Sequence, residues 1–576
     1  MTSRKEYLRW LAQEDLDGDL RAELASIENA PAEIEERFYA SLEFGTAGLR
    51  GILGAGTNRM NVPVVRRATA GLADYVLRFA GGASRGVAIA YDSREKSDLF
   101  ALETAKTLAA FGVKAHLFPS LRPVPLLSFA LRHLGCIAGV VVTASHNPPA
   151  YNGYKVYWEH GGQCGPEQAR EIYSRMARFD YFGLPSIDED AARAEGLIAT
   201  IDHRTDDAYY AATATLLQWP QLLAERGAEL KLVYTPLHGS GLVPVTTLLS
   251  RAGVTNVAVV PGQAQPDPRF STVAAPNPED PGAFALAIRL ANEVGADAIL
   301  ATDPDSDRMG LAVRKPGGDF AVLTGNKIGC LLLDYLLCSM KEKGTLPADG
   351  FVVKSLVSTR MAEAVCERFG VACFDVPTGF RFVSEKIDES ARTGRGTFLF
   401  GFEESYGYLA GTDVRDKDAV VAAMLIAEMA ARCADRGETL HDRLRSLFAR
   451  FGFAAEETVS LTLEGMDGVR RIQEAMGRLR ARPAGDLAGI PVVARSDYLA
   501  GLRVEPGTGI VAPLALPQSD VLLYETGDLD WCCVRPSGTE PKLKIYFGAY
   551  DRDESAARSR LAEVRDRLTA LIRSLL

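Results

Sequence analysis

The chain has few cysteines, nine among 576 residues, and none of them forms a Cys-x-x-Cys pair. The number is odd, and the side chains of Cys532 and Cys533 would point to opposite faces of a strand, so neither a disulfide framework nor a zinc site is expected. Long apolar runs are also missing. Residues 419–426 are too few to span a membrane, and residues 1–20 read as one acidic amphipathic helix without a signal-peptide core. These absences predict a cytoplasmic protein with no membrane contact.

An excess of positive charge is absent too. The chain has 64 Lys and Arg residues and 74 Asp and Glu residues, which gives a net charge of −10. This balance argues against nucleic acid as a partner, because nucleic-acid binding needs a broad basic surface. A small anionic substrate fits, since a few basic residues in a cleft can dominate the local field. The length exceeds what one hydrophobic core supports and predicts several domains.

The order of apolar patterns predicts the architecture. Strand-like runs alternate with helical patterns up to about residue 435, which indicates α/β structure. After about residue 451 polar and apolar residues alternate, as in a strand with one buried face. We expect three similar α/β domains with mixed sheets and a C-terminal α+β domain, with a helix over residues 206–218 joining the first two. The expected boundaries are 1–205, 206–322, 323–450 and 451–576.

A serine follows the apolar run of residues 137–142 in the segment Thr-Ala-Ser-His-Asn-Pro-Pro, residues 143–149. The two prolines prevent a long helix from starting there. We therefore expect a strand to deliver the Ser145 hydroxyl to an exposed loop. No Gly-x-Ser-x-Gly pattern surrounds Ser145, so it is not an obvious hydrolase nucleophile.

Three carboxylates, Asp303, Asp305 and Asp307, follow the predicted strand of residues 297–301. Their spacing places them on one side of an extended backbone, where a hard divalent cation could bind several oxygens. A solvated acidic turn is one alternative. Another is the Asp-x-Asp pattern of haloacid-dehalogenase phosphatases, in which Asp303 would be the nucleophile.

Two further segments carry polar groups after predicted strands. Residues 401–407, Gly-Phe-Glu-Glu-Ser-Tyr-Gly, suit hydrogen bonding to vicinal sugar hydroxyls, or an ordinary polar turn. Residues 535–542, Arg-Pro-Ser-Gly-Thr-Glu-Pro-Lys, combine a bidentate arginine donor, hydroxyls and a glycine that admits close backbone approach. This second segment suits a phosphate group, or a turn that connects two strands.

The four segments resemble, in the same order, the signature loops of the α-D-phosphohexomutases, the phosphoglucomutase and phosphomannomutase family. In this resemblance they are the phosphoserine, metal, sugar-recognition and phosphate-binding loops. The family's fold implies four domains around a central cleft. Residues 44–51, Phe-Gly-Thr-Ala-Gly-Leu-Arg-Gly, and the longer segment of residues 401–408 are most similar to long bacterial members related to the phosphopentomutase branch.

The resemblance assigns roles to single residues. Phosphorylated Ser145 would carry the phosphoryl group and hold one Mg²⁺ together with Asp303, Asp305 and Asp307. A phosphoserine carries nearly two negative charges, so beside three carboxylates it would need such a cation. The other implied residues are Arg50 and Lys155 for catalysis and His146, Arg308, Thr378, Glu403, Ser405, Lys417, Arg535, Ser537, Gly538 and Thr539 for substrate binding.

The implied reaction interconverts glucose 1-phosphate and glucose 6-phosphate, with glucose 1,6-bisphosphate as intermediate and activator. Mannose or pentose phosphates are alternative substrates. Two hypotheses from other classes remain open: a sugar phosphatase that uses Asp303 as its nucleophile, and an inactive sugar-phosphate-binding protein.

Overall fold

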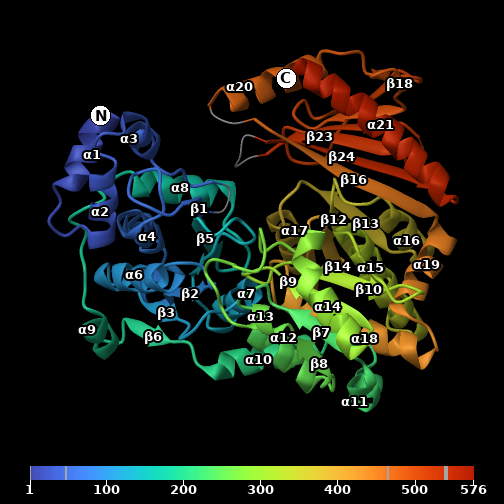
Figure 1. The fold of residues 1–576 in the computed structure, drawn as a ribbon, viewed down its shortest axis with the longest axis horizontal. Coiled ribbons are helices and arrows are strands. Elements are labelled where there is room, and N and C mark those ends of the chain that lie inside the picture. The colour runs from blue at the N-terminus through green and yellow to red at the C-terminus, as the bar shows by residue number, and fades with distance from the viewer. Residues whose placement is uncertain (1, 46–47, 464–465, 528, 538–541) are drawn as a thin grey trace. The chain divides into compact units, whose positions relative to one another are not determined.

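The chain forms two compact units in a computed structural model that describes residues 2–45, 48–463, 466–527, 529–537 and 542–576 (Figure 1). The first unit comprises Met1–Gly325, Val383–Thr393 and Ser405–Thr439, and the second comprises Asn326–Phe382, Gly394–Glu404 and Leu440–Leu576. All nine cysteines are free thiols. Among the described residues, no helix combines the length and the apolar character needed to cross a membrane.

The first sheet of the first unit has six strands in the order β1-β5-β4-β2-β3-β6. The four strands β4, β2, β3 and β6 are parallel, and β5 and β1 are antiparallel to their neighbours, so the sheet is mixed. β4 is buried at all five positions, which explains its continuous apolar sequence. The strands are β1 (Gly48–Ile52), β2 (Val87–Tyr91), β3 (Ala115–Leu117), β4 (Ala138–Val142), β5 (Tyr151–Trp158) and β6 (Ile198–Thr200).

Among the helices of the N-terminal part, α6 and α7 pack directly against this sheet. The sequence predicted one helix over residues 1–20, and this prediction is wrong because the chain forms two helices, α1 and α2. The break covers residues 12–17, where Asp15 and Asp17 have low helix propensity and the Leu16 side chain is buried. The helices are α1 (Ser3–Leu11), α2 (Gly18–Ser26), α3 (Pro31–Phe38), α4 (Val62–Val76), α5 (Gly82–Arg85), α6 (Ser97–Ala110), α7 (Val124–His133), α8 (Pro166–Met176) and α9 (Glu189–Ala194).

The second sheet of the first unit has five strands in the order β11-β10-β9-β7-β8. β7 is parallel to β8 and β9, whereas β10 is antiparallel to β9 and β11. β9 is buried at every position and ends directly before Asp303. The strands are β7 (Leu232–Thr235), β8 (Val257–Val259), β9 (Ala298–Thr302), β10 (Met309–Arg314) and β11 (Phe320–Val322).

The joining helix α10 starts and ends a few residues earlier than the sequence predicted. The Asp202 side chain accepts a hydrogen bond from the Arg204 N–H and caps the helix at its observed start. The remaining elements of this unit are α10 (His203–Ala214), α11 (Pro220–Arg226), η1 (Gly227–Glu229), α12 (Leu242–Arg251), α13 (Pro261–Ala264), η2 (Pro281–Phe284), α14 (Ala285–Val294), most of α17 (Arg381–Thr393), β15 (Gly407–Ala410) and α18 (Ala419–Asp435).

In the second unit β12 lies between β13 and β14 and pairs parallel with both. All six residues of β12 are buried, as in a strand covered on both faces. The elements of this part are α15 (Gly325–Glu342), β12 (Gly350–Ser355), α16 (Met361–Phe369), β13 (Ala372–Val376), β14 (Thr397–Glu403) and α19 (Leu440–Phe451).

The C-terminal part of the second unit is a seven-stranded sheet in the order β16-β24-β23-β22-β19-β20-β21, with α20 and α21 near one face (Figure 1). Its strands pair antiparallel, and the longest pair joins β16 to β24. The elements are β16 (Phe453–Thr462), α20 (Met466–Arg480), β17 (Asp486–Leu487), β18 (Ile490–Pro491), β19 (Ala494–Asp497), β20 (Leu502–Glu505), β21 (Ile510–Pro513), β22 (Leu522–Glu525), β23 (Trp531–Pro536), β24 (Lys542–Asp551) and α21 (Glu554–Leu575).

Candidate active site

The Ser145 loop connects β4 to β5 and has a constrained backbone. Ser145 adopts a left-handed conformation with φ of 52°, which is uncommon for a residue other than glycine. The Ser145 N–H donates to Thr143 Oγ1 at 2.8 Å, and the Asn147 N–H donates to the Ala144 carbonyl at 3.1 Å. Ser145 is only 3% exposed, so the prediction of an exposed hydroxyl is wrong.

The three aspartates lie in the loop that follows β9. The Asp303 carboxylate accepts hydrogen bonds from the N–H groups of Asp307 and Arg308, both at 3.1 Å, which closes the loop on itself. One carboxylate oxygen of each aspartate lies within 4.8 Å of those of the other two. Asp303 and Asp305 are 0% exposed and Asp307 is 2% exposed, so the solvated acidic turn is excluded.

The Ser145 loop and the aspartate loop meet in the first unit. The Ser145 hydroxyl donates to Asp303 Oδ2 at 2.8 Å. Burial, followed by the charges of Asp305 and Asp307, raises the pKa of Asp303 well above its ordinary value. The contact therefore places the predicted phosphate carrier directly beside the predicted metal site.

Two lysines balance part of the negative charge. Lys155 Nζ, from β5, lies 2.8 Å from Asp305 and 3.8 Å from Asp307. Lys417 Nζ lies 3.0 Å from Asp307 and 3.1 Å from Asp416. Burial favours a higher pKa for Asp305, but Lys155, Asp303 and Lys417 together outweigh it and the pKa is lowered. The cluster therefore holds an ionised carboxylate in a buried setting.

The aspartates also fit a metal ion. Asp305 Oδ1 and Asp307 Oδ1 are buried and accept no hydrogen bond from the described residues. Burying a carboxylate oxygen without a partner is costly, and a bound cation would remove this cost. Three carboxylates are hard oxygen ligands, which suit a divalent cation such as Mg²⁺.

Three more predicted residues border Ser145. His146 Nδ1 lies 3.2 Å from Ser145 Oγ, and its pKa is lowered well below the ordinary value by burial and by the charges of Arg308 and Arg50. Arg308 Nε lies 3.8 Å from both Asp303 and Asp307. Arg50, on β1, donates to the Asn147 side chain at 2.9 Å. Two cationic side chains, Arg50 and Arg308, thus lie near the Ser145 loop, and His146 places a ring nitrogen beside the Ser145 hydroxyl.

Asp416 is a site residue that the sequence analysis missed. It is fully buried and accepts hydrogen bonds from Tyr157 at 2.8 Å, from Gln163 at 3.0 Å and from Lys417 Nζ. These bonds hold Lys417 against Asp307. The available signal was the Asp-Lys-Asp sequence, but the sequence could not show that Tyr157 and Gln163 pack against it.

The neighbouring Asp418 supports a testable pH dependence. It caps α18 by accepting from the Val421 N–H at 2.9 Å, and burial raises its pKa from 3.8 to about 6. The folded protein therefore holds the proton more tightly than the unfolded chain, and this contribution to stability disappears as the pH rises from about 4 through about 6. The difference corresponds to about 3 kcal/mol.

Asp418→Asn retains a good capping residue and removes the titration. We expect the Tm of wild type to fall relative to that of Asp418→Asn between pH 4 and 6.5, as followed by differential scanning calorimetry. Asp413→Asn, at an exposed position of the same segment, is the control and should follow wild type. A constant Tm difference between wild type and Asp418→Asn over this range would contradict the prediction.

The second unit carries most of the remaining predicted residues. Thr378 lies in the turn between β13 and α17, Glu403 is the buried last residue of β14, and Arg535 near the end of β23 donates to the Tyr546 hydroxyl at 3.4 Å. The Ser537 N–H donates to the Lys542 carbonyl at 2.7 Å. Ser405 belongs to the first unit, and Gly538 and Thr539 lie outside the described residues.

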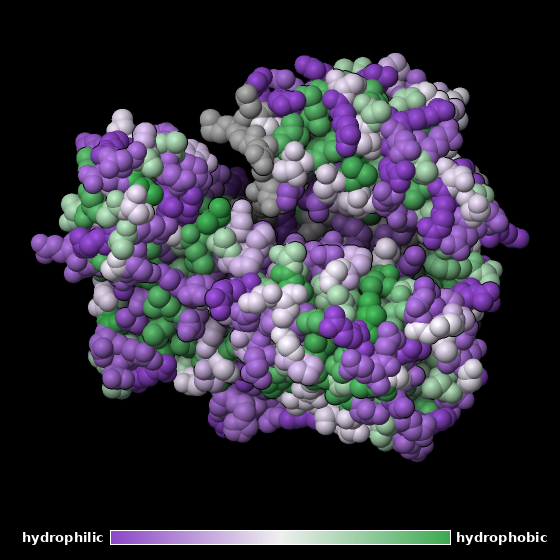
Figure 2. All heavy atoms as spheres, in the orientation of Figure 1, coloured by the Kyte–Doolittle hydropathy of each residue, from purple (hydrophilic) through white to green (hydrophobic). Residues whose placement is uncertain are grey.

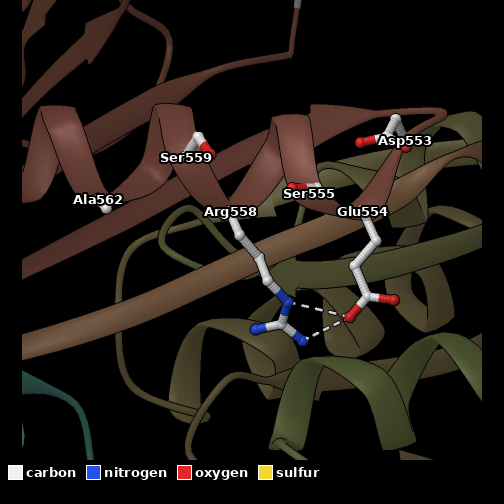
Figure 3. A pocket seen from close by; sticks show the side chains of 6 residues that line it. All are labelled: Asp553, Glu554, Ser555, Arg558, Ser559 and Ala562. Atoms are coloured by element: carbon white, nitrogen blue, oxygen red, sulfur yellow. Dashed lines mark hydrogen bonds and ion pairs between the residues drawn. The ribbon is translucent and has the colours of Figure 1, made fainter.

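A surface depression of the second unit contains none of the predicted site residues. It follows the first turns of α21, where Arg558 pairs with Glu554 at 2.7 Å (Figure 3). On the visible face of the molecule, hydrophilic residues surround scattered groups of apolar ones (Figure 2). The depression is lined by Asp553, Glu554, Ser555, Arg558, Ser559 and Ala562.

Comparison with known families covers nearly the whole chain. Residues 41–181, 207–318 and 324–451 match the phosphoglucomutase/phosphomannomutase alpha/beta/alpha domains I, II and III, and residues 462–566 match the C-terminal domain of the same family. A phosphoglucomutase of Staphylococcus haemolyticus is 36% identical over 519 residues, which are 89% of this chain and 91% of the relative. A phosphoglucomutase of Staphylococcus saprophyticus is 34% identical over 88% of this chain and 91% of its own length.

Solved structures share the fold. A putative phosphomannomutase from Thermus thermophilus has a TM-score of 0.67 at 24% identity and covers 92% of this chain and 99% of its own. The Paramecium phosphoprotein pp63/parafusin, a phosphoglucomutase, has a TM-score of 0.68 at 16% identity and covers 93% and 95%. The chain therefore belongs to the phosphoglucomutase/phosphomannomutase family of phosphohexomutase enzymes. The α/β fold class and the family expected from the four loops are confirmed.

Proposed function

We propose that the protein is a phosphoglucomutase in which phosphorylated Ser145 interconverts glucose 1-phosphate and glucose 6-phosphate. The observation that carries the proposal is the 2.8 Å contact between the Ser145 hydroxyl and Asp303, inside a buried cluster of three carboxylates. Curated relatives that share about a third of the sequence over most of the chain are named phosphoglucomutases. The free thiols fit a cytoplasmic enzyme.

The chemistry follows from the residues around Ser145. In the forward direction the phosphoryl group leaves Ser145 Oγ for O6 of glucose 1-phosphate, which gives glucose 1,6-bisphosphate. This intermediate reorients within the site and returns its other phosphoryl group to Ser145, which leaves glucose 6-phosphate. His146, Arg308 and Arg50 supply positive charge or hydrogen bonds near the transferring group. Lys155 is the residue that we propose to exchange the proton of the sugar hydroxyl.

Asp303, Asp305 and Asp307 would hold Mg²⁺ together with the phosphate on Ser145. When bound, the ion supplies positive charge that polarises the phosphoryl group and offsets its repulsion by the carboxylates. Both oxygens of Asp303 already accept hydrogen bonds, one from the Ser145 hydroxyl and the other from backbone N–H groups of its own loop. Asp303 is therefore a poor nucleophile, which argues against the phosphatase alternative.

The substrate-holding roles follow the family resemblance. Glu403 and Ser405 would bind sugar hydroxyls, and Thr378 and Lys417 would contact the substrate. Arg535, Ser537, Gly538 and Thr539 would bind the phosphate that does not react. The four-domain division at residues 205, 322 and 450 is proposed on the same basis. These roles account for the polar residues found at or just after the ends of buried strands, such as Ser145, Asp303 and Glu403.

The test is an assay of the purified protein with glucose 1-phosphate, mannose 1-phosphate and ribose 1-phosphate, each with Mg²⁺ and the matching bisphosphate. We expect glucose 1-phosphate to give the highest kcat/KM, with label from radioactive glucose 1,6-bisphosphate recovered on the peptide that contains Ser145. A preference for mannose or ribose phosphate would refute the sugar assignment. Release of inorganic phosphate without isomerisation would refute the mutase assignment.

A further inference from the structure

Arg94 is a buried cation directly beneath the Ser145 loop. It lies between β2 and α6, and its side chain is fully shielded from solvent. One terminal nitrogen donates to the carbonyls of Pro148 and Tyr151 at 2.9 and 3.0 Å. The other donates to the carbonyls of Ser145, at 2.6 Å, and Asn147. A single guanidinium thus binds four backbone carbonyls within seven residues of the loop.

A second set of bonds fixes Arg94 itself. The Arg94 N–H donates to Asp92 Oδ1 at 2.9 Å, and the Arg94 side chain lies 3.3 Å from Asp92 Oδ2. Asp92 also accepts from the Thr143 hydroxyl at 2.6 Å, and Thr143 Oγ1 in turn accepts the Ser145 N–H. Asp92 therefore links Arg94 to Thr143, whose hydroxyl accepts the hydrogen bond from the Ser145 N–H.

The other face of the guanidinium packs on an aromatic ring. The centre of the guanidinium lies 4.9 Å from the ring of Phe270, which is fully buried and belongs to the segment before α14. Desolvation strengthens such a cation–π contact. Arg94 is thus held from both sides, and its charge lies near Asp303 and Asp305, which interact with it electrostatically.

We propose that Arg94 is a positioning residue that fixes the Ser145 loop for phosphoryl transfer, by binding the four carbonyls and so holding Ser145 Oγ against Asp303. The assignment rests on the proposed role of Ser145. With the carbonyls turned toward Arg94, the left-handed Ser145 backbone is maintained and the hydroxyl faces the aspartates. A planar guanidinium can reach four acceptors in this way, whereas a lysine ammonium, with three donors around one atom, cannot.

The proposal predicts a specific kinetic defect. Arg94 touches the loop backbone and none of the residues proposed to bind the sugar, so its loss should lower kcat and leave KM for glucose 1-phosphate within about twofold. A displacement of about 1 Å at a reacting group can cost about 100-fold in rate. We expect about this loss of kcat for Arg94→Met, and a loss of at least about tenfold for Arg94→Lys, which keeps the charge but not the planar fork.

The experiment measures single-turnover transfer from the phosphorylated full-length enzyme to glucose 1-phosphate by rapid quench, together with steady-state kcat and KM and a Tm for each variant. Arg175→Met is the matched control, because Arg175 is another largely buried arginine of the same part of the chain and pairs with Asp74 at 2.6 Å. This control should lower the Tm without lowering the transfer rate.

Each outcome decides the proposal. Slow transfer with an unchanged KM in folded Arg94→Lys supports it. Transfer at the wild-type rate in folded Arg94→Lys and Arg94→Met overturns it, and failure of both variants to fold assigns Arg94 to the stability of the fold and also overturns it. If wild type itself takes no phosphate on Ser145, the proposed function fails instead, so the two failures are distinguishable.

Discussion

We expect Ser145→Ala to abolish mutase turnover, with a loss of at least about 10⁴-fold in kcat, because Ser145 is the described residue whose hydroxyl donates to the Asp303 carboxylate. The substitution removes one buried oxygen atom. The backbone of the loop keeps its hydrogen bonds to Arg94 and Thr143, which do not involve the Ser145 hydroxyl. The variant should therefore fold. Formation of glucose 6-phosphate in a coupled assay measures the loss.

Labelling provides an independent readout of the same variant. Wild type incubated with radioactive glucose 1,6-bisphosphate should retain label after denaturation, and Ser145→Ala should retain none. Ser174→Ala removes a hydroxyl from helix α8, where it donates only to the Glu171 carbonyl, and should behave as wild type in both assays. Turnover at the wild-type rate in Ser145→Ala would contradict the phosphoserine mechanism, and continued release of inorganic phosphate would favour the phosphatase alternative.

The sequence was sufficient for those parts of the site that short segments encode. Ser145 and the three aspartates each follow an apolar run, and the structure places those runs as the buried strands β4 and β9. The loop after β4 and the loop after β9 meet where the Ser145 hydroxyl donates to Asp303. The order of local patterns therefore predicted the α/β fold, and the spacing of the three aspartates predicted a group of carboxylates that could hold a metal ion.

The remaining features depend on contacts between distant residues. Arg94 precedes Ser145 by about fifty positions, and nothing in its own segment indicates that its guanidinium binds the Ser145 loop. Asp416 meets Tyr157 across an even longer separation. The burial of Ser145 was missed for the same reason, since Asp303, to which its hydroxyl donates, belongs to the loop after β9 of the other sheet. Local patterns cannot show which loops cover one another.

The aspartate cluster leads to the second large effect. Asp305→Asn keeps the size of the side chain but removes a charge and a strong oxygen ligand, while Lys155 loses the carboxylate to which it is paired at 2.8 Å. We expect mutase activity to fall by at least about 100-fold and the dissociation constant for Mg²⁺ to rise by about tenfold or more. Activity at increasing Mg²⁺ concentrations gives the first value, and calorimetric titration of the phosphorylated protein with Mg²⁺ gives the second.

Asp297→Asn is the matched control for this prediction. Asp297 directly precedes β9, is exposed, and accepts a hydrogen bond from the Lys231 N–H at 2.9 Å. The same chemical change there should alter neither Mg²⁺ binding nor turnover, because the strand separates it from the cluster. Wild-type Mg²⁺ affinity in Asp305→Asn would remove Asp305 from the metal site. If Asp305→Asn loses activity but keeps its Mg²⁺ affinity, Asp305 contributes to catalysis through its ion pair with Lys155. The substitution weakens that ion pair as well.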